Sequence, residues 1–397
     1  MPANATSLLA LMLSSFVGLG VLYGGGGVLW NDVIDAFGIS KGVFGLAQSL
    51  GVIAGLPVLV FGGRLADRFD KRLLLAVSLA ITVIPAVGII FGSVVGILVL
   101  LLIIQGIGVT ALDLSNNALA MDVERSTRRH IMGPLHATFS VGSLIGPLVA
   151  GLLIWLGGDY KSVYAVIAVM FAGLAVFALV SLKQEAPPSL APEQEHSPLH
   201  ALYLLKNRTN RDLAAIAGIA FASELLIAQW VGIYFQDERH YAKSVTVIAL
   251  SLNGAAMAIG RFGNGPLNAR IGAIRMLLFQ GCVTMLGGLL IAAGPNAAVA
   301  VAGCAIAGFG LAGMAPTTLS LVGLANPTAP GAASGAVLLV GYAGIAVAPF
   351  LAGMVSTFAS TRIALAGVAF GGLAVVVVAR RIVNEIRQHS AQPPVPA

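Results

Sequence analysis

Asp113 and Glu224 are acidic residues that lie deep within long apolar segments, where an ionised side chain is costly. The sequence places no Lys or Arg at the same depth, so we expect both carboxylates to be unpaired and desolvated. Desolvation favours the neutral acid, and such a group can bind and release a proton near neutral pH. Both residues are therefore candidates for proton coupling or for binding a solute.

A polar stripe surrounds the first of these acids. Asn116 and Asn117 follow Asp113 at three and four residues, on one helix face, and Gln105 lies eight residues before it. We expect this stripe to line a cavity, although these groups could instead bond to neighbouring helices. His136 is predicted at a similar depth on the next segment, where a His–Asp pair could carry a proton. A histidine that only satisfies a backbone carbonyl is the alternative.

A second set of polar and aromatic residues follows Glu224 on its segment. Gln229, Trp230 and Tyr234 complete this set, and the two aromatic residues are four positions apart. Aromatic faces near an acid suit a sugar ring or an organic cation, so we expect these side chains to line the cavity. The alternative is that Trp230 and Tyr234 belong to an aromatic belt at the membrane surface. Weaker cavity candidates are Tyr23, Gln48, Asn253, Gln280 and Tyr342.

The elements that must position these residues are long apolar helices. Apolar residues make up 58% of the 397-residue chain and charged residues 10%, against about 25% charged in a soluble domain. Runs of about 20 apolar residues can each cross a bilayer as a helix. The first run lacks a basic flank and is predicted as a span, not a signal peptide. The sequence predicts an all-α integral membrane protein with twelve spans, near 6–29, 42–62, 73–93, 96–120, 131–156, 163–182, 212–235, 245–262, 275–293, 297–322, 331–356 and 361–380.

Basic residues predict the orientation of these spans. Of the 22 Lys and Arg residues, 17 fall on one side of the predicted spans and five on the other. The positive-inside rule then places both termini in the cytoplasm, and we expect a prokaryotic inner membrane. This distribution explains the basic pI without a nucleic-acid partner. Cys282 and Cys304 fall inside predicted spans, so neither a disulfide scaffold nor a metal site is expected.

The second half of the chain repeats the first at an offset of 202 residues. Gly63-Arg64-Leu65-Ala66-Asp67-Arg68 returns as Gly265-Pro266-Leu267-Asn268-Ala269-Arg270, and the pair Gly142 and Pro147 returns as Gly344 and Pro349. Two similar helical bundles with a site between them are the plan of a secondary transporter. We therefore expect bundles at 1–182 and 212–397, joined by a polar, proline-containing linker at 183–211.

The segment from Gly63 to Arg72 resembles the signature loop of the major facilitator superfamily, whose pattern is G-x-L-x-D-R-x-G-R-R. Asp70 stands where that family usually has Gly, and the second copy has Ala269 in place of the Asp. The resemblance extends over the whole chain at the level of spans and halves. It implies two six-helix bundles, a central cavity, and solute movement by alternating access without hydrolysis. The residues that it assigns to a cytoplasmic gate are Gly63, Asp67, Arg68, Arg72, Gly265 and Arg270.

Two local patterns suggest different branches of that superfamily. The segments Asp113–Asn117 and His136–Gly142 look like the fucose-permease-like branch, which implies proton-linked symport of a sugar-like or other small polar solute. The spacing of Gly133, Gly142, Gly146-Pro147 and Gly151 instead resembles a motif of drug/proton antiporters, and this alternative stays open. Because the second half repeats most of this spacing, we interpret it mainly as a bending and packing element. The residues given this helix-bending role are Gly142, Gly146, Pro147 and Pro349.

Other classes of function are disfavoured. The chain has no His/Glu zinc spacing, no Gly-x-Ser-x-Gly and no Walker-type loop, so we expect no enzyme, no cofactor and no metal. The expected partners are a small-molecule substrate, protons and the lipid bilayer, with the protein as a monomer. A cavity rich in Asn, Gln and His would favour a sugar-like solute. One dominated by Phe, Met and Leu around an acid would favour export of drugs or other lipophilic compounds.

Overall fold

The computed structural model describes residues 3–127, 131–182, 203–326 and 329–391, and all regular structure in those ranges is helical. Twelve helical segments are long and apolar enough to cross a membrane, as the sequence predicts. The first six are α1 (Ala3–Phe37), α2 (Lys41–Arg68), α3 (Lys71–Phe91), α4 (Val95–Thr127), α5 (Met132–Trp155) and α6 (Tyr160–Ser181). The remaining elements are α8 (Arg208–Ile233), the π-helical turn η1 (Tyr234–Glu238), α9 (Lys243–Ile271), α10 (Ala273–Ala293), α11 (Ala297–Leu311), α12 (Met314–Ala325), α13 (Pro330–Phe358) and α14 (Thr361–Ala391).

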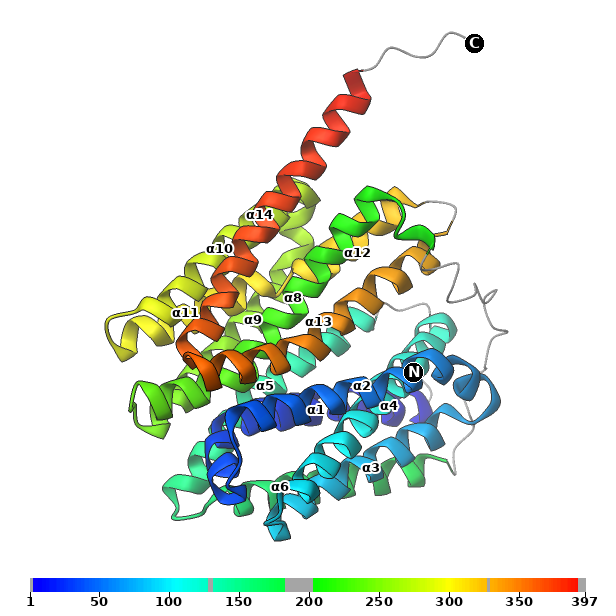
Figure 1. Cartoon of the computed structure of the whole chain (residues 1–397). Helices are drawn as coiled ribbons and strands as arrows, with labels where there is room; N and C mark the ends of the chain where they lie inside the picture. The colour runs from blue at the N-terminus through cyan, green and yellow to red at the C-terminus, as the bar shows by residue number, and fades with distance from the viewer. Residues whose placement is uncertain (1–2, 128–130, 183–202, 327–328, 392–397) are drawn as a thin grey trace.

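The helices form two groups that lie side by side (Figure 1). In the first group α1 packs on α5, α2 on α4, and α3 on both α4 and α6. The second group pairs α8 with α13, α9 with α11, and α10 with α11 and α14. The contacts between the groups are chiefly α2 with α13, α5 with α9, and α1 with α8. The first turn of α1 and the last turn of α14 point to the same side of the molecule, which we call the terminal side; the opposite side is the far side.

Polar caps define several helix starts. The side chains of Ser40, Asp70, Asp159, Asn207 and Asn296 each accept a hydrogen bond from a backbone N–H in the first turn of the helix that follows. Such caps satisfy donors that a helix start leaves without a partner. Asn207 caps α8, so this helix begins at Arg208, three residues before the predicted linker end at 211. Residues 183–202 of that linker lie outside the described residues.

Several glycines permit close approach between the groups on the far side, and two of them illustrate the packing. A Cβ on Gly254 of α9 would come within 2.6 Å of the Leu144 backbone nitrogen on α5. A Cβ on Gly353 of α13 would come equally close to the Lys41 carbonyl oxygen at the start of α2. Small residues at such positions let membrane helices pack backbone to backbone. The two groups therefore touch most closely on the far side.

The residues predicted to bend helices have a clear packing role. Gly142 and Gly146 of α5 face the backbone of α1, where a side chain would collide with the Val17 and Val21 carbonyls. Both α5 and α13 continue as helices through Pro147 and Pro349. The tenth span is interrupted instead, because α11 ends at Leu311 and α12 begins at Met314. Bending at the two prolines stays a prediction.

Candidate functional site

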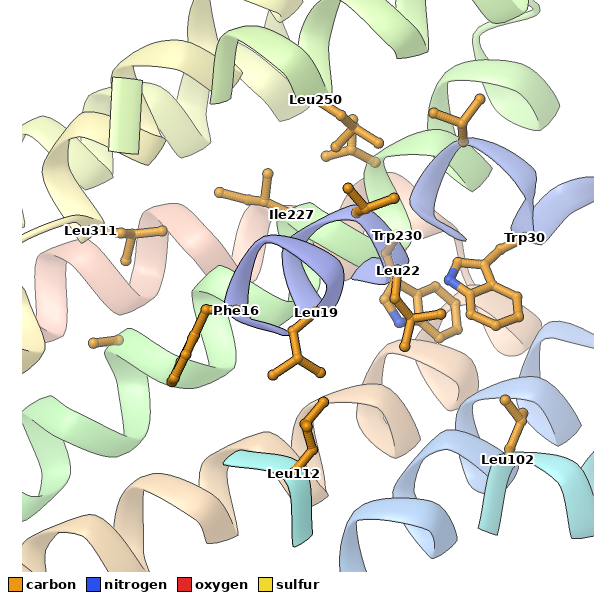
Figure 2. Packing of buried hydrophobic residues seen from close by; sticks show 14 of the residues in the cluster. Phe16, Leu19, Leu22, Trp30, Leu102, Leu112, Ile227, Trp230, Leu250 and Leu311 are labelled. Carbon is orange, nitrogen blue, oxygen red and sulfur yellow. The ribbon is translucent and has the colours of Figure 1, made fainter. Parts of the chain in front are cut away.

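A cavity of about 280 Å³ lies between the two groups of helices. Helices α1, α2, α4 and α5 supply one wall, and α8, α9 and α13 supply the other. Most of the lining is apolar or aromatic: Phe16, Leu19, Tyr23, Val52, Val109, Phe139, Phe221, Leu225, Leu250, Met257 and Ile345. Figure 2 shows Phe16 and Leu19 on α1 and Leu250 across from them. Four acidic or basic side chains line this apolar space: Asp113, His136, Glu224 and Arg261.

Asp113 connects the two walls. Its Oδ2 accepts a hydrogen bond of 3.1 Å from the Tyr342 hydroxyl on α13, and its Oδ1 accepts one of 3.1 Å from Asn117 Nδ2. No Lys or Arg among the described residues forms an ion pair with it. An acid without a basic partner in an apolar cavity is suited to taking up a proton. Asn117 holds this carboxylate and is not itself part of the lining.

Glu224 has a basic partner, so the prediction of an unpaired acid at this position is wrong. Arg261 Nη2 donates to Glu224 Oε1 at 3.0 Å, and both side chains are partly exposed to the cavity. Arg261 lies next to the predicted end of its span at 262, where a charged side chain would reach the aqueous surface. In the structure α9 continues to Ile271, which brings Arg261 more than two helical turns inside the helix.

Arg261 also reaches the opposite wall. Its Nη1 donates to Ser140 Oγ at 2.7 Å and to the His136 carbonyl at 3.3 Å, both on α5. The guanidinium lies 5.7 Å from the centre of the Phe139 ring. Charged groups at membrane depth usually face a bundle interior and pair in this way. The cavity thus has two polar links between its walls, one through Asp113 and one through Arg261.

His136 lines the cavity as expected, with an exposed side chain. Its ring packs edge-on against Phe16, with the ring centres 5.0 Å apart. The charges of Asp113, Arg261 and Glu224 all act on the imidazole, but no hydrogen bond joins it to Asp113 among the described contacts. His136 and Asp113 are therefore close enough for their charges to interact, but no described hydrogen bond joins them.

A smaller hollow of about 50 Å³ lies beside the cavity and shares Tyr23, Val52, Gly106, Leu225 and Ile345 with it. The predicted residues Gln105 and Gln229 line this hollow, together with Gln48 and Trp30. Gln229 Oε1 accepts from Trp30 Nε1 at 2.5 Å and from Gln48 Nε2 at 3.3 Å, while its Nε2 donates to the Tyr23 carbonyl. Gln229 on α8 is thereby bonded to both α1 and α2.

Asn116, Trp230 and Tyr234 were predicted to line the cavity but, like Asn117, lie outside both linings. Asn116 is buried and donates to the Met12 carbonyl on α1 at 3.1 Å, which is the helix-to-helix alternative. Trp230 and Tyr234 are also buried, so they line neither the cavity nor a surface belt. Trp230 packs on Phe44, with ring centres 5.7 Å apart, and lies beside Trp30 (Figure 2). Six residues separate it from Glu224, which turns it about 240° around the helix.

The predicted gate segment is mostly helical. Helix α2 continues to Arg68, so that only Phe69 and Asp70 connect it to α3. Arg68, Gly265 and Arg270 are exposed, whereas the surroundings of Gly63 and the side chain of Asp67 lie outside what the structure describes. Arg72 is buried and donates to Asp70 and, at 2.9 Å, to the Ser181 carbonyl of α6. These contacts of Arg72 stay within its own group of helices.

Ion pairs on the far side join the two groups and were missed by the sequence analysis. Lys41, at the start of α2, pairs with Asp237 and lies 3.8 Å from Glu238 of η1. Lys243, at the start of α9, pairs with Asp32 of α1 at 2.6 Å. Asp32 lies past the predicted end of the first span at 29, but α1 continues through it to Phe37. Most described hydrogen bonds and ion pairs between the two groups therefore lie either at the cavity or between the cavity and the far side.

Comparison with known proteins identifies the family. The profile of the Major Facilitator Superfamily matches residues 8–349. The chain belongs to this superfamily. It is therefore a multi-pass membrane transporter of a small solute rather than an enzyme. The two groups of six spans are the two bundles of the superfamily fold, and the cavity between them is the candidate solute site.

Relatives within the superfamily are distant. An uncharacterised transporter of this type from Yersinia pestis is 21% identical over 86% of this chain and 86% of its own length. A class G tetracycline resistance protein from Vibrio anguillarum is 23% identical over 73% of this chain and 74% of its own. A crystal structure of a nucleoside transporter shares the fold, with a TM-score of 0.78 and 16% identity over 96% of this chain and 99% of that one. The narrower likeness to fucose permeases stays a prediction.

Proposed function

We propose that this transporter moves a small amphipathic organic solute by alternating access, in symport with protons. The observation that carries the proposal is the position of Asp113. This acid lies in a largely apolar cavity, without a basic partner among the described residues, and accepts a hydrogen bond from Tyr342 of the other bundle. A proton on Asp113 would change the strength of a link between the bundles, because hydrogen bonds to an ionised acceptor are stronger than neutral ones.

The alternating movement is assigned to the two bundles, 1–182 and 212–397, which rock about the cavity. Two features support this assignment. The far-side contacts between bundles are ion pairs and close glycine contacts, which can separate and re-form. The solute would enter or leave on the terminal side in this conformation and on the far side in the other. With the positive-inside orientation, the terminal side is cytoplasmic and the membrane is a prokaryotic inner membrane.

The lining supports an amphipathic solute more than a sugar. Apolar and aromatic side chains make up most of it, and of the amides predicted to line the cavity the described lining contains Asn253. Asn116 bonds to α1 and Asn117 to Asp113, while Gln105 and Gln229 line the smaller hollow. A volume of about 280 Å³ is close to the lower limit of about 300 Å³ for small-molecule sites.

Proton-coupled export of lipophilic compounds is the second candidate. The apolar lining favours it, and so does the tetracycline resistance protein among the relatives. Export by antiport requires that proton and solute compete, whereas symport requires that they bind together. The direction of proton movement therefore separates the two candidates.

The test is proton movement in purified proteoliposomes that contain a pH-sensitive dye. Small aromatic acids, aromatic amines, neutral analogues and sugars are added outside, one at a time. A fall in internal pH upon addition of a solute supports symport, and a rise supports antiport. Solute uptake without any pH change overturns proton coupling. Liposomes without protein control for passive diffusion of the weak acids and bases.

A further inference from the structure

Arg261 carries the one fixed positive charge among the described residues that line the cavity. Its side chain is 21% exposed and that of its partner Glu224 is 25% exposed, so both are accessible from the cavity. The proposed function uses Asp113 for the proton and leaves the Arg261–Glu224 pair without a role. A charge pair retained at membrane depth generally marks a solute or ion pathway.

The pair is incomplete as a carboxylate–guanidinium contact. Glu224 accepts one hydrogen bond, from Nη2, while Nε of Arg261 donates to no described residue. The Nε–Nη2 edge of a guanidinium is suited to two parallel hydrogen bonds with one carboxylate. The Nη1 group is engaged separately with Ser140 and the His136 carbonyl, which fixes the plane of the guanidinium. The Nε–Nη2 edge of Arg261 could thus donate two hydrogen bonds to an anion, and Glu224 accepts only one, from Nη2.

The surroundings of this edge are apolar. Phe139 lies under the guanidinium, Phe16 packs on the neighbouring His136, and Met257 lies one helical turn before Arg261 on α9. A solute with its charged group at Arg261 would place its body against these side chains. A cation would find a poorer site, because Arg261 already neutralises Glu224 and two hydrogen bonds already engage Asp113.

We propose that the solute is an amphipathic organic anion whose carboxylate, or another planar oxyanion, binds the Nε–Nη2 edge of Arg261 in place of Glu224. The apolar body of the solute then lies against Phe16, Phe139 and Met257. This inference rests on the proposed function and specifies the class of its solute. Displacement leaves Glu224 without its countercharge in an apolar cavity, where an added negative charge is costly, and the proton that Asp113 takes up offsets this charge. Anion and proton therefore bind together.

The first test is ligand binding to the purified protein in detergent, measured as a shift in thermal unfolding. The probes are three carboxylates with different bodies, benzoate, 4-phenylbutyrate and octanoate, each compared with its amide and its primary amine. For at least one body, the carboxylate should bind about tenfold more tightly than both counterparts, as expected for a charge-assisted bidentate contact. Equal binding of all three head groups, or a preference for the amine, overturns the inference.

Variants then assign the preference to Arg261. Arg261→Gln should remove the carboxylate preference, and Arg261→Lys should keep a weaker one, because Lys lacks the planar donor edge. Glu224→Gln should keep or strengthen carboxylate binding, because the competing charge is gone. The matched control is Arg275→Gln, which changes an exposed arginine at the start of α10 and should bind as the unmodified protein does. Unchanged carboxylate binding in a folded Arg261→Gln protein contradicts the proposal.

Failure of this inference is distinguishable from failure of the proposed function. Binding in detergent needs no proton gradient, so carboxylate selectivity without proton movement in liposomes removes only the proton coupling. Proton-coupled uptake of neutral or cationic solutes, with no carboxylate preference, removes only the anion assignment. Elution as a single species and unfolding without ligand at the unmodified temperature establish that each variant is folded.

Discussion

Tyr342 and Asp113 form a hydrogen bond across the two bundles, from the Tyr342 hydroxyl to Asp113 Oδ2 at 3.1 Å. We expect the proposed movement of the bundles to break this bond, so that it stabilises the conformation with a closed far side relative to the alternative. An ionised acceptor makes such a bond worth about 1.5–3 kcal/mol. Protonation of Asp113 should weaken the link, so the proton state and the bundle arrangement are connected through this pair.

Tyr342→Phe should therefore shift the population toward the conformation with an open far side by at least about tenfold, since a loss of about 1.5–3 kcal/mol corresponds to roughly 10- to 150-fold. The ring is kept, including its packing 6.3 Å from Phe221, so folding should be preserved. The measurement is the distance between spin labels at Lys161 and Pro295, which are exposed on the far side of the two bundles. Longer distances are expected in the variant, and an identical distribution would show that the bond has no influence on the movement.

Asp113→Asn should abolish proton-coupled flux and leave the fold intact. Asparagine has nearly the same shape, and its one amide oxygen can still accept the hydrogen bond from Tyr342, but it cannot take up a proton. Exchange of labelled for unlabelled solute across the membrane needs no net proton movement and should persist. The measurements are dye-reported pH and solute counterflow in the same liposomes. Normal proton coupling in this variant would remove Asp113 from the mechanism.

Long apolar runs made the architecture predictable, because each span must satisfy its backbone within one helix and be about 20 residues long. The ends of helices were less predictable. Helices α1, α2 and α9 extend past their apolar runs to Phe37, Arg68 and Ile271, with polar residues on faces that contact the other bundle or the aqueous side. Because these extensions contain polar residues, a prediction from hydrophobicity alone ends each helix too early.

The same limitation explains the errors at the site. Arg261 lies at the edge of an apolar run, where a charge is typical of the membrane surface. In the structure α9 continues past it, and its side chain bonds to Glu224 and Ser140. Trp230 and Asn116 were placed in the cavity because they are near acids in sequence. Which face of a helix looks into a cavity depends on its neighbours, and only the three-dimensional packing shows that α1 and Phe44 cover these side chains.

Asp70 stands where the family usually has glycine. Its side chain caps the N-terminus of α3, which a glycine could not do. Its carboxylate accepts from the Arg72 backbone N–H at 2.9 Å, and the side-chain hydrogen bond from the Arg72 guanidinium holds the pKa of Asp70 below its usual range. At the repeated position Gly272 instead adopts a φ of 85°, in the left-handed region that favours glycine. The two copies of the motif thus turn between helices in different ways.

Asp70→Ala should lower the free energy of unfolding by about 1 kcal/mol, the usual cost of losing a cap. Because the folded pKa is lowered, the stabilising effect of the Asp70 charge is present above its unfolded pKa of about 3.9 and is lost as pH falls through the folded value. Thermal unfolding in detergent between pH 7 and pH 3 measures both effects. Asp70→Asn keeps a capping oxygen and should retain most of the stability at pH 7. A steeper loss of stability in acid for Asp70→Ala than for the unmodified protein would contradict this account.

Like the hydrogen bond of Tyr342, the far-side ion pairs should favour the conformation with a closed far side. They do so through charge attraction, which salt screens. Lys41 with Asp237, and Lys243 with Asp32, join the bundles where their side chains are partly exposed. Exposed pairs of this kind contribute about 0.5 kcal/mol each and are screened by salt. Lys41→Gln combined with Lys243→Gln should open the far side roughly fivefold more often at low ionic strength, from a loss of about 1 kcal/mol.

The measurement is the rate at which a membrane-impermeant maleimide, added outside cells, modifies Leu225→Cys, a position that lines both hollows. The background carries Cys282→Ser and Cys304→Ser, so that no other thiol reacts. Labelling should be faster in the double variant at low salt, and the difference should shrink in high salt because screening has already weakened the pairs in the unmodified protein. Lys161→Gln is the matched control, since Lys161 is exposed at the start of α6 on the same side. Equal labelling rates at low salt would mean that the glycine contacts alone hold the far side closed.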